Sequence, residues 1–320
     1  IKLPDWNYDG SSTKQAITNN SEVILKPRTK FIDPFGGDIL VMCDTYDING
    51  NPLKTNNRYE LEKIIKHDQE TWYGFEQEYS IINPKSGKPL GFPETEGYLP
   101  QPQGDYYCGV GFSYVKNGRE IAYNHLDLCI EAGITISGIN SEVMTGQWEY
   151  QVGPVTALEG SDALWISRYI LYRIGEEYGM EINIEPKPVS GDDWNGSGMH
   201  VNFSTDGMRD KNNIANGKSI KLIEEACDKL EKKHKEHLTV YGKGNEKRLT
   251  GINETSSMDT FSWSYGSREA SIRIPMGVKD RKVGYLEDRR PSSNADPYIV
   301  VRKLIETICI KDKNMVEECE

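Results

Sequence analysis

The stretch Trp72-Tyr73-Gly74-Phe75-Glu76-Gln77-Glu78-Tyr79-Ser80-Ile81-Ile82 determines how the rest of the chain is interpreted. Aromatic and β-branched residues dominate it and Asn83-Pro84 follows, a pattern that predicts a β-strand. Side chains alternate along a strand, so Glu76 and Glu78 share one face, opposite Gln77 and its apolar neighbours. Two neighbouring carboxylates on such a strand could hold a divalent cation, form an acid/base pair, or lie in water at the surface.

Composition limits what the chain can be. Its 320 residues can bury a large core in one or two domains. The chain is 37% hydrophobic and 27% charged, and no apolar run approaches the roughly 20 residues that span a membrane. The net charge of −11 disfavours a non-specific nucleic-acid or membrane-surface protein, although a few local arginines could still bind a nucleotide.

The N-terminus and the cysteines favour a cytoplasmic protein. Residues 1–6 have the features of neither a signal peptide nor a transit sequence. The chain does not start with methionine, so we expect a trimmed or incomplete N-terminus. None of the six cysteines falls in a C-x-x-C pair, which favours free thiols in a reducing compartment over a zinc or redox site.

Turn signals and hydrophobic periodicity predict two structural regions. Residues 1–54 form a small β-rich unit with strands near 23–26, ended by Pro27, and near 39–43, and with a polar loop at 6–13. From residue 55 to 320, helices and strands follow each other, but the strands come in pairs between the helices. This order favours an α+β fold with a large, mostly antiparallel sheet over a doubly wound fold. Helices are expected near 56–68, 118–132, 161–178, 220–237 and 297–309, and strands near 134–143, 147–152, 182–184, 199–204 and 271–275.

Several polar side chains lie on strands that are otherwise apolar, or at their edges. Such charges cost several kcal/mol each when buried together, unless cations neutralise them. Carboxylates with a single imidazole suit Mg²⁺ or Mn²⁺ better than zinc, and two ions with three ligands each would use the whole set. The residues are Glu76, Glu78, Glu142, Glu149, His200 and Glu287.

Arginines are frequent near the end of the chain. The arginine fork matches phosphate and carboxylate oxygens, and arginines combined with metal ions indicate phosphoryl transfer. The sequence has no G-x-x-x-x-G-K-[ST] loop, and Gly109-Val110-Gly111 lacks the third glycine of a dinucleotide fingerprint. A nucleotide would therefore be held by metals and arginines. The arginines are Arg248, Arg268, Arg273, Arg289 and Arg290.

Motifs along nearly the whole chain resemble those of glutamine synthetase, in its shorter, eukaryotic-like type II class. They occur in the order that the family shows. They are Trp-Asn-Tyr-Asp-Gly-Ser-Ser-Thr at 6–13, Gly-Phe-Glu-Gln-Glu-Tyr at 74–79, Asn-Ser-Glu-Val-Met at 140–144, Gln-Trp-Glu-Tyr-Gln-Val-Gly-Pro at 147–154, Trp-Asn-Gly-Ser-Gly-Met-His at 194–200, Arg-Leu-Thr-Gly at 248–251, Ser-Ile-Arg-Ile-Pro at 271–275 and Glu-Asp-Arg-Arg-Pro at 287–291. One loop, at 191–194, carries one more aspartate than the family pattern.

The resemblance implies an architecture and an assembly. It implies a small N-terminal β-grasp domain, of which residues 1–54 would be a truncated form, and a catalytic domain over residues 55–320. The catalytic domain would have a curved, mostly antiparallel sheet flanked by helices. It further implies a cytoplasmic ring homo-oligomer, a decamer of two pentamers, with active sites between subunits and no nucleic-acid or membrane partner.

The resemblance also implies ATP-dependent ligation of ammonium to glutamate through a γ-glutamyl phosphate, with two or three Mg²⁺ or Mn²⁺ ions per site. One ion, near glutamate, would be held by Glu78, Glu142 and Glu149. The second ion, on the phosphates, would be held by Glu76, His200 and Glu287.

Roles follow for the other matching positions. Arg268 and Arg289 would neutralise the transferred phosphoryl group. Glu254 would close the site as a flap carboxylate and take a proton from ammonium, while Asp9, from a neighbouring subunit, would bind ammonium. Glutamate or phosphate would be bound by Arg248 and Arg273, and glutamate also by Asn195 and Gly196. The nucleotide would be contacted by Trp72, Asn202, Ser204 and Tyr285.

Two other functions remain open from the sequence. A related ligase that joins glutamate to a different amine would keep the metal and phosphate residues and change only the ammonium pocket. A catalytically silent structural homologue would have lost metal ligands, whereas all six matching positions are intact here. A glycosidase that uses Glu76 and Glu78 is a more distant alternative, since it would need neither His200 nor the arginines.

Overall fold

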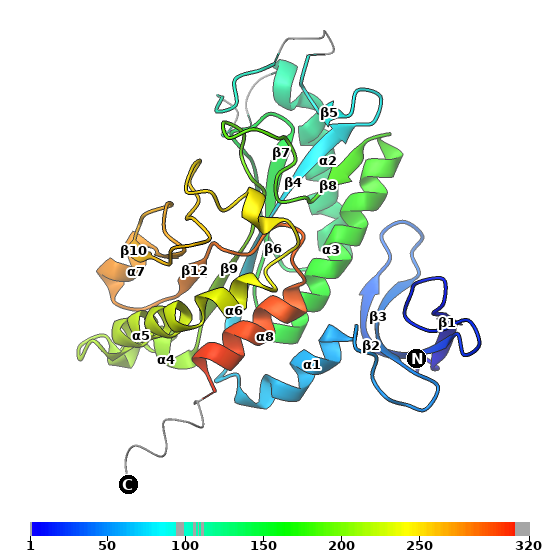
Figure 1. Cartoon of the computed structure of the whole chain (residues 1–320), viewed down its shortest axis with the longest axis horizontal. Coiled ribbons are helices and arrows are strands. Elements are labelled where there is room, and N and C mark those ends of the chain that lie inside the picture. The colour runs from blue at the N-terminus through cyan, green and yellow to red at the C-terminus, as the bar shows by residue number, and fades with distance from the viewer. Residues whose placement is uncertain (1, 94–98, 105–106, 108, 110–111, 311–320) are drawn as a thin grey trace.

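The computed structural model describes residues 2–93, 99–104, 107, 109 and 112–310. These residues form two sheets with helices around them (Figure 1). The smaller sheet lies at one side of the molecule and contains the N-terminal part of the chain, while the larger sheet runs through the main body (Figure 1). The predicted α+β class with a large, mostly antiparallel sheet is confirmed.

The small sheet has three antiparallel strands in the order β1 (Trp6–Asp9), β2 (Glu22–Ile32) and β3 (Ile39–Tyr46). Two predictions were wrong here. The first half of the expected loop at 6–13 is strand β1, and β2 continues through Pro27. Strand β1 pairs only with residues 22–25 of β2, and the register with β3 shifts just after Pro27. Proline is tolerated at such a place because the ladder there needs no hydrogen bond from its nitrogen.

The large sheet holds the candidate site. Its main path runs in the order β10-β11-β12-β9-β4-β7-β6, with β5 and β8 also paired to β4. All its described pairings are antiparallel except that of β10 with β11. Strand β7 does not end at Gly153-Pro154, as expected, but includes both residues. The strands are β4 (Trp72–Asn83), β5 (Lys88–Pro89), β6 (Ile136–Ser141), β7 (Gln147–Val155), β8 (Glu181–Asn183), β9 (Met199–Ser204), β10 (Trp263–Tyr265), β11 (Ile272–Ile274) and β12 (Leu286–Asp288).

The helices lie at the predicted positions, but two begin several residues earlier than expected, and the single helix expected near 220–237 is divided into Lys218–Lys232 and His234–Leu238. Helix α2 starts at Phe112 rather than 118. Helix α3 starts at Ala157, where Thr156 and Glu159 form a capping box, so Ser161 and Asp162 lie inside the helix. The helices are α1 (Asn57–Ile64), α2 (Phe112–Glu131), α3 (Ala157–Glu177), α4 (Asp206–Arg209), α5 (Lys218–Lys232), α6 (His234–Leu238), α7 (Met276–Arg281) and α8 (Pro297–Ile308), with short 3₁₀ turns at Ile65–His67, Lys211–Asn213 and Asn245–Lys247.

Helices cover one face of the large sheet and leave the other face to polar groups. Helix α3 packs against β4 and β7, and α2 packs against β6, β7 and α3. Phe75, Gln77 and Tyr79 of β4 are buried on the helical side. Alternation along the strand therefore directs Glu76 and Glu78 to the opposite face, as the sequence predicts.

A buried polar cluster joins the small sheet to the main body. Asp162 of α3 accepts hydrogen bonds from Arg58 Nε of α1 (2.9 Å), Thr29 Oγ1 of β2 (2.6 Å) and Tyr298 Oη of α8 (2.5 Å). Three elements are thus fixed to one carboxylate. The need for these contacts explains why Asp162 sits within a helix rather than at its N-terminus.

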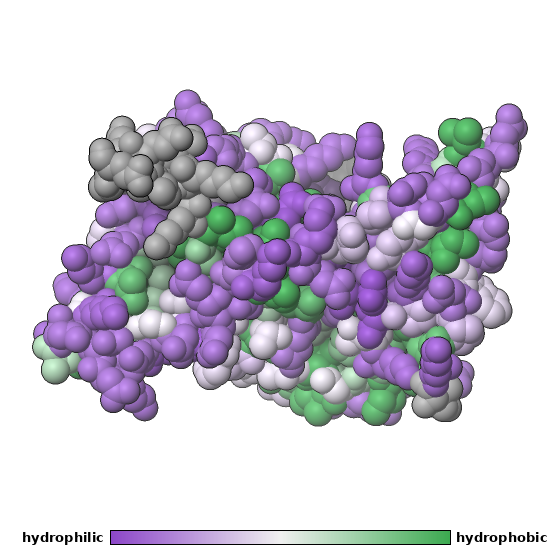
Figure 2. Space-filling view, turned by 90° about the horizontal axis from the view of Figure 1, so that it is seen from below, coloured by the Kyte–Doolittle hydropathy of each residue, from purple (hydrophilic) through white to green (hydrophobic). Residues whose placement is uncertain are grey.

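The face of the molecule that Figure 2 shows is mainly hydrophilic. Hydrophilic side chains spread over most of that face, and the hydrophobic ones form separate patches. Among the described residues, no helix combines the length and apolar character needed to cross a bilayer. The described cysteines, Cys43, Cys129, Cys227 and Cys309, are free thiols as predicted, while Cys108 and Cys319 lie outside the described residues.

Candidate active site

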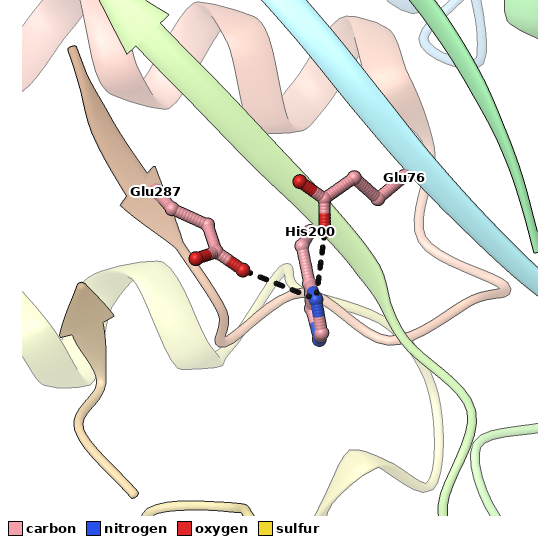
Figure 3. A group of neighbouring side chains, drawn as sticks. All are labelled: Glu76, His200 and Glu287. Atoms are coloured by element: carbon pink, nitrogen blue, oxygen red, sulfur yellow. Dashed lines mark ion pairs between the residues drawn. The ribbon is translucent and has the colours of Figure 1, made fainter. Parts of the chain in front are cut away.

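Three neighbouring strands bring Glu76, His200 and Glu287 together, and we call this group the histidine triad (Figure 3). Glu76 of β4 lies opposite His200 of β9, and Glu287 of β12 lies opposite Asn202 of the same strand. The Nδ1 nitrogen of His200 is 3.4 Å from Glu76 Oε2 and 3.4 Å from Glu287 Oε1. One atom of each residue lies within 4.8 Å of the others, so the group could hold a metal ion.

The charges around the histidine triad are balanced by arginines. Burial would raise the pKa of Glu287, but the hydrogen bond with His200 and the charge of Arg289 lower it to about 2. Burial and Arg289 would lower the pKa of His200, yet its hydrogen bonds with Glu287 and Glu76 raise it. Arg248 Nη2 lies 2.9 Å from His200 Nε2, so that nitrogen accepts and the Nδ1 side faces the carboxylates.

The acidic triad consists of Glu78, Glu142 and Glu149. It lies on the same face of the sheet, toward β7, whereas the histidine triad lies toward β9. Glu78 of β4 pairs with Glu149 of β7, and Glu142 directly follows β6. Burial and repulsion from Glu78 raise the pKa of Glu142 to about 8. Burial and the nearby Glu76, Glu78 and Glu142 likewise raise the pKa of Glu149. Three carboxylates this close therefore oppose one another's ionisation.

Both triads fit divalent metal ions. The donors are five carboxylates and one imidazole, the set that suits Mg²⁺ or Mn²⁺. The raised pKa of Glu142 is the structural sign of the fit, because a cation among the three carboxylates would remove the repulsion. Hydrogen bonds already orient two of these ligands: the Asn202 side chain donates to Glu76 Oε1 (2.8 Å), and the Gly198 backbone amide donates to Glu78 Oε2 (2.6 Å).

A polar pocket lies between the triads and a loop that follows Arg248. Arg268 Nη2 forms an ion pair of 2.8 Å with Glu254 Oε2, and both side chains are about half exposed. Arg289 donates to Glu287 Oε1 (2.7 Å) and to the backbone oxygen of Glu254 (3.2 Å), so the loop rests on the buried site. The lining residues are Glu78, Glu142, Gln147, Asn195, Gly196, His200, Arg248, Asn253, Glu254, Thr255, Arg268 and Arg289.

A second, more apolar cavity of about 420 Å³ opens beside Glu76. Strand β4, strand β9 and the end of β7 form it. It includes all four residues that the sequence analysis assigns to the nucleotide, namely Trp72, Asn202, Ser204 and Tyr285. The guanidinium of Arg209 lies 4.2 Å from the centre of the Trp72 ring and donates to Ser204 Oγ (2.9 Å), so it fixes two of these side chains.

Three of the expected site residues belong to neither triad and do not line the polar pocket. Asp9 is in the small sheet, where it accepts hydrogen bonds from Ser11 and Ser12, and it lines neither pocket. Arg273 is not among the residues that line the polar pocket with Arg248, but it pairs with Glu287 at 3.2 Å. Arg290 is fully buried against Asp288 (2.7 Å), which makes it a core residue rather than a phosphate ligand.

The structure adds residues that the sequence analysis missed. Gln147 donates to the Gly196 backbone oxygen (2.9 Å), and Gln151 donates to Glu149. Both stand two residues from Glu149 on β7, so the period of two along a strand could have identified them. Asn253 has a positive φ and donates to the backbone oxygen of Asp192 (2.6 Å), a contact between two loops that no sequence signal shows.

Known proteins are similar to this chain in sequence and in fold. A family model described as glutamine synthetase, catalytic domain, matches residues 54–309. Glutamine synthetase N-1 of Phaseolus vulgaris and the cytosolic isozyme 1-3 of Arabidopsis thaliana are each 50% identical over 312 residues, covering 96% of this chain and 85% of theirs. The cytosolic isozyme 1-1 of Oryza sativa subsp. japonica is 49% identical over 315 residues, covering 97% of this chain and 86% of its own.

A solved structure agrees at the level of the fold. The cryo-EM structure of Plasmodium falciparum glutamine synthetase superposes with a TM-score of 0.77 at 18% identity, over 98% of this chain and 67% of that one. The sequence match to the relatives covers nearly all of this chain and includes both triads, which lie between residues 76 and 287. The chain therefore belongs to the glutamine synthetase family.

Proposed function

We propose that this chain catalyses the ATP-dependent ligation of ammonium to L-glutamate, giving L-glutamine through γ-glutamyl phosphate. The observation that carries the proposal is the arrangement of the two triads on one face of the sheet, with Arg248, Arg268 and Arg289 over the pocket between them. With cations held by the triads, this arrangement would place positive charge on both sides of a transferred phosphoryl group, the arginines supplying the other side. Charge neutralisation and positioning are what phosphoryl transfer requires.

ATP binds in the cavity beside Glu76 in this proposal. Its lining is mostly apolar and aromatic, with a few polar groups, as in small-molecule sites generally. Trp72 and Tyr285 offer ring faces for the base, and Asn202 and Ser204 offer hydrogen bonds. Glu76 lines this cavity and also belongs to the histidine triad, so phosphates of a nucleotide bound here would point toward the triad.

The metals would be two or three Mg²⁺ or Mn²⁺ ions per site. Bound ions would offset phosphate charge and polarise the oxygens of the transferring group. The histidine triad would hold one ion and the acidic triad another. The protein's own contribution is to orient these six side chains before any substrate arrives, five of them on adjacent strands and Glu142 just after β6.

Glutamate binds in the polar pocket. Arg248, Asn195 and Gly196 line it and would hold the carboxylate and amino groups at the α-carbon. The side-chain carboxylate then attacks the γ-phosphorus of ATP, and ADP leaves. Arg268 and Arg289 stand beside this position and would neutralise the phosphoryl oxygens, while Arg273, paired with Glu287, would act from the nucleotide side.

The loop at 248–257 supplies the lid. An acyl phosphate is hydrolysed by water, so the site has to exclude water while it waits for ammonium. Glu254 is held over the pocket by Arg268 and would take the proton that ammonium must lose. Ammonia then attacks the acyl carbon, phosphate leaves, and glutamine is formed.

Assembly completes the site in this proposal. Asp9 lies away from the pockets of its own chain, so the Asp9 of a neighbouring subunit would bind ammonium in a ring, a decamer of two pentamers. Isolated monomers should then be inactive, and an active, verified monomer would overturn the assignment of Asp9. We place the domain boundary at residue 54, between β3 and α1. We propose a cytosolic location, because the matching relatives include isozymes named cytosolic.

The first test is phosphate release from ATP with Mg²⁺ and glutamate, with and without ammonium. The wild type should release phosphate and form glutamine only with ammonium, and Glu254→Ala should lose this ammonium-dependent phosphate release and glutamine formation. Glu269→Ala is the matched control, because Glu269 is an exposed glutamate outside the pocket lining. Release with a primary amine but not with ammonium would favour the related amine ligase, and no release from the intact oligomer would favour a silent homologue.

A further inference from the structure

Two amide side chains connect two carboxylates of the acidic triad. Gln151 Nε2 donates to Glu149 Oε1 and to Asn140 Oδ1, the second bond being 2.7 Å long. Asn140 Nδ2 in turn donates to Glu142 Oε1 at 3.1 Å. We call this continuous series, from Glu149 through Gln151 and Asn140 to Glu142, the amide relay.

The sheet register places the relay where it is. Asn140 of β6 lies opposite Glu149 of β7, and Gln151 follows two residues later on the same face. Gly138 lies opposite Gln151, and a Cβ atom there would be only 2.7 Å from Gln151 Oε1. Glycine at 138 therefore leaves the space in which the Gln151 amide can turn both its N–H groups to acceptors.

The relay acts on side chains that would otherwise move apart. Repulsion among the buried carboxylates favours conformations in which Glu142 and Glu149 turn away from each other. The relay fixes one oxygen of each carboxylate and leaves the second oxygen for a cation. Since amides do not titrate, it also provides these donors at every pH.

We propose that Asn140 and Gln151 are positioning residues, which hold Glu142 and Glu149 at one separation and so increase the affinity of the acidic triad for a divalent ion. The proposal rests on the proposed function only in requiring that an ion binds this triad. Outer hydrogen-bond partners of metal ligands typically contribute 10- to 100-fold in affinity.

The experiment is a Mn²⁺ titration of the intact oligomer by calorimetry, without ATP or glutamate, together with electron paramagnetic resonance of the bound ion. The variants are Asn140→Leu, Gln151→Met and the double variant, which keep side-chain size but remove the amides. Asn183→Leu is the matched control, because Asn183 is a strand asparagine of β8 that belongs to neither triad and whose side chain accepts a hydrogen bond from the Glu185 amide (2.7 Å).

Each single variant should weaken one manganese site by about 10- to 100-fold and leave the other site unchanged. The double variant should weaken it no more than the worse single variant, because breaking either link interrupts the same relay. The resonance spectrum of the weakened site should broaden as its ligands lose a fixed geometry. Asn183→Leu should match the wild type in all three measurements.

Other results overturn the proposal in distinguishable ways. A wild type that binds no Mn²⁺ removes the metal assignment in the proposed function, and the relay with it. If the wild type binds Mn²⁺ and the affinity of Asn140→Leu is within two-fold of it, the role of the amide relay is refuted while the metal assignment stands. The relay is also refuted if the effects of the two single variants multiply in the double variant. Equal weakening of both sites, with a lower melting temperature in EDTA, would refute it too, because it would indicate a general structural role.

Discussion

Arg168 offers a stringent test of how the core supports the site. It is fully buried on α3, and it donates to Gln77 Oε1 (2.8 Å), to the Ala295 backbone oxygen (3.0 Å) and to the Ser293 backbone oxygen (2.9 Å). Gln77 stands between Glu76 and Glu78 on the opposite face of β4. One arginine thus connects the central helix, the central strand and the loop before α8.

Replacing Arg168 by methionine should be strongly destabilising. The Ser293 oxygen keeps the Gln77 amide as a donor at 3.1 Å, so two acceptors, Gln77 Oε1 and the Ala295 oxygen, lose the donor that Arg168 provides. A buried polar group without its partner costs about 1–3 kcal/mol. We therefore expect Arg168→Met to lower the free energy of unfolding by about 2–6 kcal/mol.

The assay is urea unfolding at one fixed protein concentration, since assembly contributes to apparent stability. Adding Gln77→Leu should deepen the loss rather than recover it, because the Ser293 oxygen then loses the Gln77 amide, its remaining donor. Arg173→Met, five residues later on the same helix, is the control and should change stability by less than about 1 kcal/mol, because Arg173 is partly exposed. A loss below about 1 kcal/mol for Arg168→Met, or recovery of stability on adding Gln77→Leu, would refute this reasoning.

Three further predictions concern pH, packing and metal. Burial lowers the pKa of His125 to about 4. The unfolded chain therefore binds a proton at His125 below about pH 6.5 that the folded chain does not bind, and His125 alone should lower the free energy of unfolding by about 2 kcal/mol between pH 7 and pH 5. Urea midpoints at both pH values should show this, and His125→Gln should have a smaller slope. A Cβ atom on Gly160 would lie 2.7 Å from the Phe75 ring, so Gly160→Ala should lower the free energy of unfolding by about 1–3 kcal/mol, whereas Gly36→Ala, whose Cβ would make only an ordinary contact with Asp33 Oδ2 (3.9 Å), should change the unfolding midpoint little. In EDTA, Glu142→Gln should melt at a higher temperature than the wild type because it removes a repelled, buried carboxylate, yet Mn²⁺ should raise its melting temperature less; equal Mn²⁺ responses would contradict the ligand assignment.

Local rules predicted the elements well wherever one residue decides the local conformation. The two faces of β4 followed from alternation alone, and α1 lies within the helix expected near 56–68, with Asn56 at its N-cap accepting from the Tyr59 amide. The errors have tertiary causes. Thr156 and Asp162 can both cap a helix, and only the contacts of Asp162 with α1 and α8 decide between them.

The site shows the same limit. The sequence placed Glu76 and Glu78 side by side, but their separate partners depend on strand order, because β9 and β7 flank β4 on opposite sides. The division into two groups came from the family resemblance rather than from periodicity. For Arg273, the motif named the residue, but its pairing with Glu287 follows from the register of β11 with β12.

The placement of the two triads has a consequence for how such ligases can diverge. Five of the six candidate metal ligands lie on paired strands, where a backbone ladder fixes their spacing. Glu254, expected to meet the nitrogen donor, lies instead on the connecting segment 248–257, and Asn195 and Gly196, expected to meet glutamate, lie on the segment 191–198. Insertions and substitutions in these segments can reshape the acceptor pocket while the sheet keeps the phosphate chemistry intact. Changes in these loops can therefore alter which amine such an enzyme accepts.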